Sequence, residues 1–150
     1  LYTEDATYGW NYGPNEEFMT VGRDQIRDVA LGIEMGGLDG WEYPYQKVLI
    51  DDQQGEVLGF WKQIATTPRP DGGTYEVAGI GGSWFRYAGN FQWSWQRDFF
   101  DVGNATALFI QMFREGTLSD GMKARMDKAA SGEPQPCRYP VGGAPVGMWD

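Results

Sequence analysis

The residues from Phe91 to Phe100 alternate between aromatic and polar side chains, and this pattern constrains the fold more than any other. In an uninterrupted strand, one face carries the rings of Phe91, Trp93 and Trp95. The opposite face carries polar side chains, namely those of Gln92, Ser94, Gln96 and Asp98. Because buried polar groups need hydrogen-bond partners or solvent, we expect a sheet whose concave face is lined by these polar groups.

The preceding segments are typical of an α+β domain. Apolar residues recur at helical spacing over residues 23–33. Residues 46–65 predict a β-hairpin, and residues 74–87 predict a strand too long to stay flat. Three glycines between positions 79 and 82 are typical of a bulge or sharp bend. We therefore expect a strongly curved, mostly antiparallel sheet wrapped around a pocket, with helices on its concave side.

The C-terminal part changes character. Apolar spacing predicts a helix after Asp101 and a second, mostly polar helix over residues 118–130. Residues 131–150 are rich in Gly and Pro and predict an extended tail that is either docked or partly disordered. We expect one domain over residues 1–130, with this tail following it.

Charge and hydropathy exclude several kinds of partner. The net charge is −9 and no basic run occurs, which argues against nucleic acid and anionic membranes. No apolar stretch approaches the roughly 20 residues that span a bilayer. The chain begins at Leu1 with no leader-like segment, so we expect a cytoplasmic protein with residues missing upstream.

The absence of His and the single Cys limit the kinds of catalysis and metal binding open to the chain. The chain has no His, which excludes His-dependent triads and His metal sites. Its single Cys137 makes an internal disulfide impossible and a thiol nucleophile a poor candidate. Asp51, Asp52 and Asp71 have the context of turn residues, and the glycines of 79–82 lack the Lys-Ser/Thr of a phosphate loop. We expect no metal and no cofactor.

Three segments occur in an order and spacing found in other proteins. Residues 95–101 (WQRDFFD) resemble a W-x-D-Y-F-D stretch, and residues 1–8 (LYTEDATY) an f-x-e-D-v-x-y segment. Residues 21–26 (VGRDQI) resemble an x-G-R-e-x-I helix start. Over about residues 1–115 the chain thus resembles the NTF2-like superfamily, which includes SnoaL-like polyketide cyclases and limonene-epoxide hydrolases. The resemblance implies a conical fold, in which a curved mixed sheet encloses a pocket closed by helices.

The start of the chain departs from that superfamily. Its members have one or more helices before the e-D-v segment, which here occupies residues 4–6. The resemblance therefore implies either that such helices precede Leu1 or that part of the pocket wall is absent.

The resemblance makes Asp98 the principal catalytic candidate. It matches an aspartate that gives or takes a proton in the hydrolases, and it lies in a similar strand to the catalytic acid of the cyclases. A carboxyl group facing an apolar cavity has a raised pKa, which suits acid/base chemistry near neutral pH. The alternative is a structural carboxylate bonded to backbone amides or paired with an Arg.

Tyr8 matches a tyrosine that helps to position a catalytic water in the hydrolases; otherwise it is a core tyrosine. Those enzymes have an Asn two positions later, where this chain has Trp10, with Asn11 following. Their Arg-x-Asp pair on an earlier strand corresponds here to Trp61-Lys62-Gln63. The usual Asp-Arg-Asp relay is therefore incomplete, which argues against ordinary epoxide hydrolysis.

Several further residues are candidates for binding a flat, apolar substrate, although ordinary core packing explains aromatic residues equally well. They are Trp10, Asn11, Trp61, Gln63, Ile80, Trp84, Gln96 and Phe100. The aromatic segment 41–45 is either a lid or a dimer contact. The outer face of the sheet, with Trp93 and Trp95, predicts a homodimer.

Two functions from different classes fit these features. The first is a cofactor-independent enzyme that acts on a small hydrophobic molecule by carboxylate acid/base chemistry, as an isomerase, cyclase, dehydratase or hydrolase. Polyketide-, terpenoid- or steroid-like substrates fit this class. The second is a non-catalytic ligand-binding or dimerisation module. A polymer-cleaving carboxylate pair is disfavoured, because Asp98 and Asp101 are three apart on a strand and face opposite sides.

Overall fold

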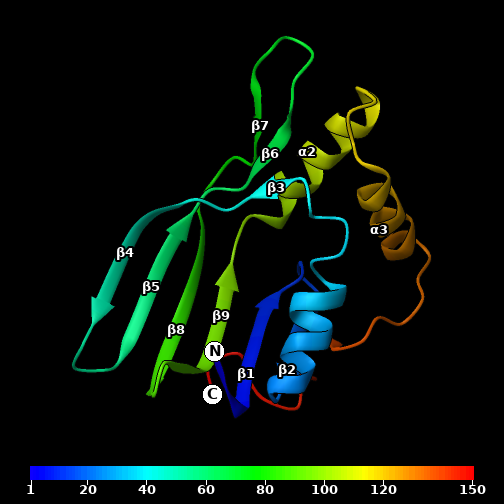
Figure 1. Ribbon diagram of the computed structural model, residues 1–150. Helices are drawn as coiled ribbons and strands as arrows, with labels where there is room; N and C mark the ends of the chain where they lie inside the picture. Colours follow the sequence, from blue (N-terminus) through cyan, green and yellow to red (C-terminus); the bar gives the residue numbers. More distant parts are fainter.

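A seven-stranded sheet forms the body of the protein in the computed structural model, which describes all 150 residues (Figure 1). All neighbouring strands are antiparallel except β1 and β9, which run parallel. Across the sheet the order is β10 (Arg138–Pro140), β2 (Glu16–Val21), β1 (Tyr2–Asn11), β9 (Gln92–Phe99), β8 (Gly81–Gly89), β5 (Glu56–Trp61) and β4 (Tyr45–Asp51). The sheet is curled but not closed, which confirms the predicted mixed α+β fold.

The helix predicted over residues 23–33 covers one half of the concave face. It consists of the short α1 (Arg23–Gln25) and the π-helix η1 (Ile26–Ile33). Ile26 and Ala30 are its buried residues. Their side chains belong to a core cluster with four residues of β1 and β2, namely Ala6, Tyr8, Trp10 and Phe18. The amphipathic spacing therefore places η1 against the strands that contribute Tyr8 to the concave face.

A second core lies beyond the C-terminal end of η1. It is built by a three-stranded sheet of β3 (Trp41–Glu42), β6 (Ile64–Pro68) and β7 (Thr74–Glu76), together with α2 (Val102–Arg114) and α3 (Asp120–Ala130). Its buried side chains are Trp41, Ala65, Tyr75, Met112, Leu118 and Met122. The segment expected to be an aromatic loop thus contributes a short strand, β3, and the buried ring of Trp41.

The aromatic row predicted for β9 does not exist, because the pairing of β8 and β9 shifts register between Arg86 and Tyr87. Trp93 packs against Phe85, with ring centroids 5.0 Å apart, on the concave side. Trp95 lies on the convex side, where it is buried. The extra residue of the bulge interrupts the strict alternation that the prediction assumed.

The C-terminal tail runs along the convex side and covers Trp95. The indole Nε1 of Trp95 donates to the Asp150 carbonyl at 2.7 Å, and the Arg97 guanidinium donates to the Met148 carbonyl at 2.8 Å. Before that, β10 adds an edge strand next to β2. The outer surface proposed as a dimer contact is therefore occupied by the chain itself around Trp95.

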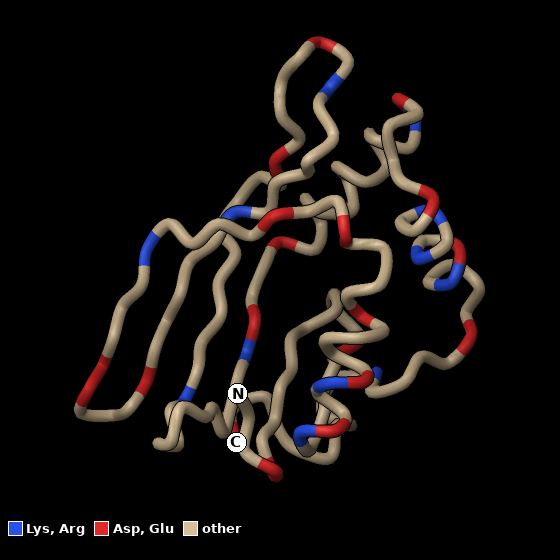
Figure 2. The backbone as a smooth tube through the Cα atoms, in the orientation of Figure 1, with Lys and Arg blue, Asp and Glu red and all other residues tan.

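The basic residues are scattered over all parts of the molecule and form no continuous stripe (Figure 2). None of the helices has the length and apolar character needed to cross a membrane.

Candidate active site on the concave face

Asp98 projects from β9 into the concave side of the sheet and accepts hydrogen bonds from two neighbouring side chains. The Tyr8 hydroxyl donates to its Oδ2 at 2.6 Å, and Gln96 Nε2 donates to its Oδ1 at 2.9 Å. Ser83, its cross-strand partner on β8, lies beside the carboxyl group and favours its ionised form. Strand pairing therefore brings three polar groups from three strands to one carboxyl group.

These contacts belong to a longer network. The Tyr2 hydroxyl donates to Gln96 Oε1, and this bond leaves the Gln96 amide oriented with its Nε2 toward Asp98. On the other side, Trp61 Nε1 donates to Ser83 Oγ at 3.0 Å. The network thus crosses the concave face from β1 to β5, with Asp98 at its centre.

No cation contacts the Asp98 carboxyl group. Burial raises the pKa of Asp98, and the neighbouring Gln96, Tyr8 and Ser83 side chains offset only part of that effect. The neighbouring Arg97 points to the opposite face, where it bonds to the C-terminal tail. Although Asp98 as a residue is only half-buried, its carboxyl group is desolvated. It is therefore a carboxyl group with a raised pKa and no counter-ion.

The same burial acts on the surrounding phenols. Burial and the nearby Asp98 charge raise the pKa of Tyr8 well above its usual value, so the hydroxyl stays protonated and acts as a donor. Burial raises the pKa of Tyr43 to about 12. All the phenols near Asp98 are therefore hydrogen-bonding groups rather than bases at neutral pH.

Aromatic rings from β5, from the segment before β4 and from the residue after β9 form one wall of the site. The Trp61 ring lies 5.5 Å from Tyr43 and 6.4 Å from Phe100, measured between centroids. Gly81 allows this arrangement, because a Cβ there would come within 2.2 Å of the Trp61 ring. Gly59 does the same for the ring of Tyr45.

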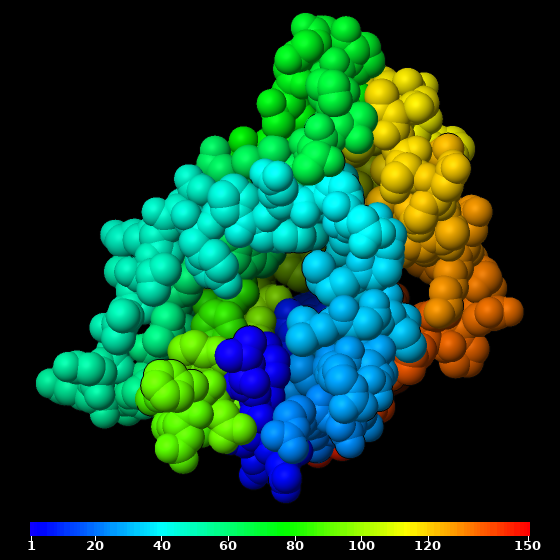
Figure 3. Space-filling model, in the orientation of Figure 1, coloured from blue at the N-terminus to red at the C-terminus, as the bar shows by residue number.

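Figure 3 shows a hollow on this side of the molecule, framed by η1, the segment that leads into β4 and the start of β1. Next to the Trp61 wall there is a small crevice of about 10 Å³, which is also lined by Gln63, Ile80 and Phe100. Gln63 Nε2 lies 3.4 Å from the Tyr43 hydroxyl. Ile80 is mostly exposed at the rim of this crevice.

The structure thus brings together most of the residues that the sequence analysis singled out. Asp98, Tyr8 and Gln96 are hydrogen-bonded, and Trp10 packs edge-on against Tyr8 at 5.3 Å. Trp61, Gln63, Ile80 and Phe100 form the adjoining crevice.

Two candidates lie elsewhere. Trp84 is on the convex side, where its ring packs against Trp95 and Trp149, because it neighbours the inward-facing Ser83 in an alternating strand. Asn11 is exposed at the end of β1, opposite Glu17 of β2. Neither belongs to the group around Asp98.

Two members of the network, Tyr2 and Ser83, were missed. Tyr2 precedes Tyr8 by an even number of residues on the same predicted strand, so alternation alone favours a common face. Predicting Ser83 would have required the pairing register of β8 and β9. The sequence does not specify that register around a bulge. Tyr43 and Tyr45 fall in the segment expected to be a lid or dimer contact, and in the single chain they contribute to the wall of the site.

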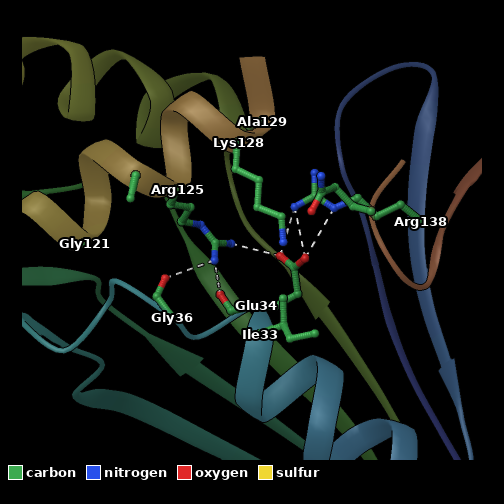
Figure 4. Close-up of a pocket in the computed structure, with 10 residues that line it drawn as sticks. Ile33, Glu34, Gly36, Gly121, Arg125, Lys128, Ala129 and Arg138 are labelled. Atoms are coloured by element: carbon green, nitrogen blue, oxygen red, sulfur yellow. Dashed lines mark hydrogen bonds and ion pairs between the residues drawn. The ribbon is translucent and has the colours of Figure 1, made fainter. Parts of the chain in front are cut away.

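A larger cleft of about 220 Å³ lies between η1, α3 and β10 (Figure 4). At its base the buried carboxylate of Glu34 pairs with Arg125 at 2.9 Å and with Arg138 at 3.0 Å. Arg125 also donates to the Glu34 and Gly36 carbonyls. The polar groups here are committed to one another and hold three elements together, so we assign this cleft a structural role.

The chain offers no cluster of three or more acidic or Cys side chains suited to a metal ion. The carboxyl group, amide and phenols around Asp98 can instead donate, accept and transfer protons without a bound ion.

Comparisons with known proteins address the fold. No protein-family model matches the sequence, and no curated protein matches it. Among solved structures, an NTF2-like protein of unknown function from Burkholderia pseudomallei has a TM-score of 0.52 at 11% identity, covering 71% of this chain and 78% of that one. A protein assigned as a SnoaL-like polyketide cyclase from Jannaschia sp. has a TM-score of 0.50 at 15% identity, covering 71% of this chain and 72% of that one.

A third similar structure is TerC, co-crystallised with polyporic acid. It has a TM-score of 0.51 at 14% identity and covers 71% of this chain and 78% of its own. At such identities the similarity establishes the fold. The chain therefore has the fold of the NTF2-like superfamily, as the motifs in its first 115 residues predicted.

Proposed function

We propose that the protein is a cofactor-independent enzyme that binds a small hydrophobic molecule on the concave face and transfers a proton through Asp98. The single observation that supports this most strongly is a buried carboxyl group without a cationic partner on the concave face, next to the Ser83 hydroxyl that Trp61 contacts. Structural carboxylates in protein interiors are normally paired with a cation. Asp98 is not, and the desolvation that raises its pKa prepares it for general acid/base work.

The chemistry follows from the neighbours of the carboxyl group. In its protonated form Asp98 donates to a substrate oxygen or carbon, and in its ionised form it removes a proton from an acidic C–H or from water. The Tyr8 hydroxyl and the Gln96 amide stabilise the ionised form by donating to it. This set supports isomerisation, cyclisation, dehydration or hydrolysis.

The substrate class follows from the wall around it. Trp61, Tyr43 and Phe100 offer flat apolar surface, and phenol and amide groups lie beside them to bond to substrate oxygens. A flat, oxygenated, polyketide-like molecule fits such a surface. The SnoaL-like and TerC structures with the same fold support this choice, since one is assigned as a polyketide cyclase and the other holds polyporic acid.

One observation favours a second candidate, a non-catalytic carrier of such molecules. The Asp98 carboxyl group already interacts with Tyr8, Gln96 and Ser83, which is the pattern of a satisfied structural group. The Arg-x-Asp pair of the hydrolase relay is also absent, since Trp61 and Gln63 occupy its two positions.

The two candidates are separated by identifying what the protein holds and what it does to it. Native mass spectrometry followed by extraction identifies any molecule that co-purifies, and polyporic acid serves as a defined probe of binding by tryptophan quenching. The enzyme hypothesis predicts that the wild type converts an identified ligand or its precursor, and that Asp98→Asn reduces kcat by about 10²-fold or more while binding persists. A carrier would hold the molecule unchanged, with equal affinity in wild type and variant.

A further inference from the structure

Strand β4 (Tyr45–Asp51) forms the free edge of the seven-stranded sheet, at the end opposite β10. All seven of its residues are exposed. Three consecutive apolar side chains lie at its centre: Val48, Leu49 and Ile50 are 51%, 45% and 72% exposed. Its backbone pairs on one side only, with β5, so a row of N–H and C=O groups is open along the other side.

Such an edge is a template for another strand, and proteins usually interrupt it with Pro, a bulge or several charges. Residues 47–51 have regular pairing to β5 and contain no Pro. The only charges within the strand are Lys47 and Asp51, which flank the apolar centre symmetrically. Lys47 has no ion pair in the single chain, and the Asp51 carboxylate accepts only from the Gln53 and Gln54 amides of the turn.

We propose that two copies of this chain pair antiparallel through β4, with the two-fold axis at Leu49. Lys47 then lies opposite Asp51 of the second copy, and Val48 lies opposite Ile50. The pairing joins the two sheets edge to edge. It closes both free edges, covers the apolar centre and forms two symmetric ion pairs.

Symmetry leaves few alternatives to this register. A two-fold axis perpendicular to a continuous sheet keeps each side chain on its own face, so residues that lie opposite each other differ by an even number of positions. An axis at Val48 would place Lys47 opposite Leu49. An axis at Ile50 would place Leu49 opposite Asp51. Only the axis at Leu49 matches charge with charge and apolar with apolar.

This interface differs from the convex surface discussed above, and it does not depend on the function of Asp98. The strand itself supplies the charge complementarity that points to a second copy rather than to another protein.

Sedimentation velocity over a concentration series tests the proposal. We expect the wild type to dimerise. Lys47→Asp and Asp51→Lys should each be monomeric, with dissociation constants weakened roughly 10- to 30-fold, because two ion pairs become two repulsive pairs. An equimolar mixture of the two variants should form a heterodimer, because each Asp then faces a Lys. Lys123→Asp on α3 is the control and should leave the dimer intact.

Asp51→Lys also removes two hydrogen bonds of the turn, so circular dichroism checks the fold of each variant. A heterodimer in the mixture would show in addition that both variants are folded. If Asp51→Lys does not fold, Ile50→Lys takes its place as a second variant predicted to be monomeric. A wild type that stays monomeric throughout the series would overturn the proposal. So would a dimer that Lys47→Asp leaves unchanged, because its interface would lie elsewhere.

Discussion

Two carboxyl groups in this protein, those of Glu34 and Asp98, are shielded from water in opposite ways. Glu34 lies between η1, α3 and β10 and forms ion pairs with Arg125 and Arg138 (Figure 4). Asp98 lies on the concave face among phenols, an amide and a hydroxyl, and no cation contacts it. The fold supplies cationic partners to the Glu34 carboxylate and none to the Asp98 carboxyl group.

This difference distinguishes a carboxyl group with a structural role from one that we propose to transfer protons. A carboxylate held by two guanidinium groups links the elements that supply them, at the cost of its own desolvation. A carboxyl group that only neutral donors contact has a raised pKa and can exchange its proton. The larger cleft therefore contains Glu34, and under the proposed function the site of Asp98 lies on the concave face, near the smaller crevice.

Removing the negative charge of Glu34 should have the largest effect on stability. Glu34→Gln leaves Arg125 and Arg138 without their counter-ion, and we expect a loss of about 3 kcal/mol in the free energy of unfolding. Urea denaturation measures it, with the exposed Glu133→Gln as the matched control. Equal stability of Glu34→Gln and the control would show that the ion pairs do not hold η1, α3 and β10 together.

Asp98→Asn, in contrast, should stabilise the protein, by an amount that depends on pH. Because the folded-state pKa of Asp98 is raised, the native state binds more protons than the unfolded state, and the wild type loses stability as pH rises from about 4, the unfolded pKa. The loss continues up to the folded pKa and amounts to about 1.4 kcal/mol for each pH unit that separates the two pKa values. An asparagine side chain does not titrate, so the variant should become more stable relative to the wild type across that window.

Unfolding curves of both proteins at several pH values test this. A difference in stability that does not change with pH would mean that Asp98 has the same pKa in both states.

Trp61 and Trp84 lie on opposite faces of the sheet, so substituting each of them tests which face binds the ligand. Trp61 lines the crevice and supports Ser83, whereas Trp84 packs under Trp149 on the convex side. We expect Trp61→Phe to weaken binding of polyporic acid about tenfold and Trp84→Phe to leave it unchanged. Calorimetric titration measures both affinities. The reverse order would place the binding surface on the convex face.

The smallest expected effect concerns the tyrosine that donates to Asp98. Tyr8→Phe removes a 2.6 Å hydrogen bond, which should cost about 1 kcal/mol of stability and raise the pKa of Asp98 further, because that bond favours the ionised form. Tyr139→Phe is the control, since the Tyr139 hydroxyl has no hydrogen-bond partner. A lowered Asp98 pKa in Tyr8→Phe would contradict the assigned direction of this bond.

The sequence predicted the general fold and the centre of the site because both depend on local pattern. Helical spacing located η1, and strand alternation placed Gln96 and Asp98 on one face. The errors arise where the pattern is interrupted. The register shift at Arg86 and Tyr87 moved Trp93 to the concave side, and no local signal marks its position.

Other features depend on contacts between distant segments. The burial of Trp95 required the tail to return across the convex face, which depends on bonds from Trp95 and Arg97 to residues 50 or more positions away. The ion pairs of Glu34 join residues even farther apart, at separations of 91 positions to Arg125 and 104 positions to Arg138. Neither charge spacing nor hydropathy along the chain contains that information.

The titration of Asp98 itself tests the central claim most directly. Carboxyl ¹³C NMR of the wild type, with the resonance assigned by its loss in Asp98→Asn, gives the pKa of this one group. We predict a midpoint clearly above the value of about 3.9 for an unperturbed aspartate. A midpoint at or below 3.9 would mean that the surrounding hydrogen bonds hold Asp98 ionised, and it would contradict the assignment of acid/base chemistry to the concave face.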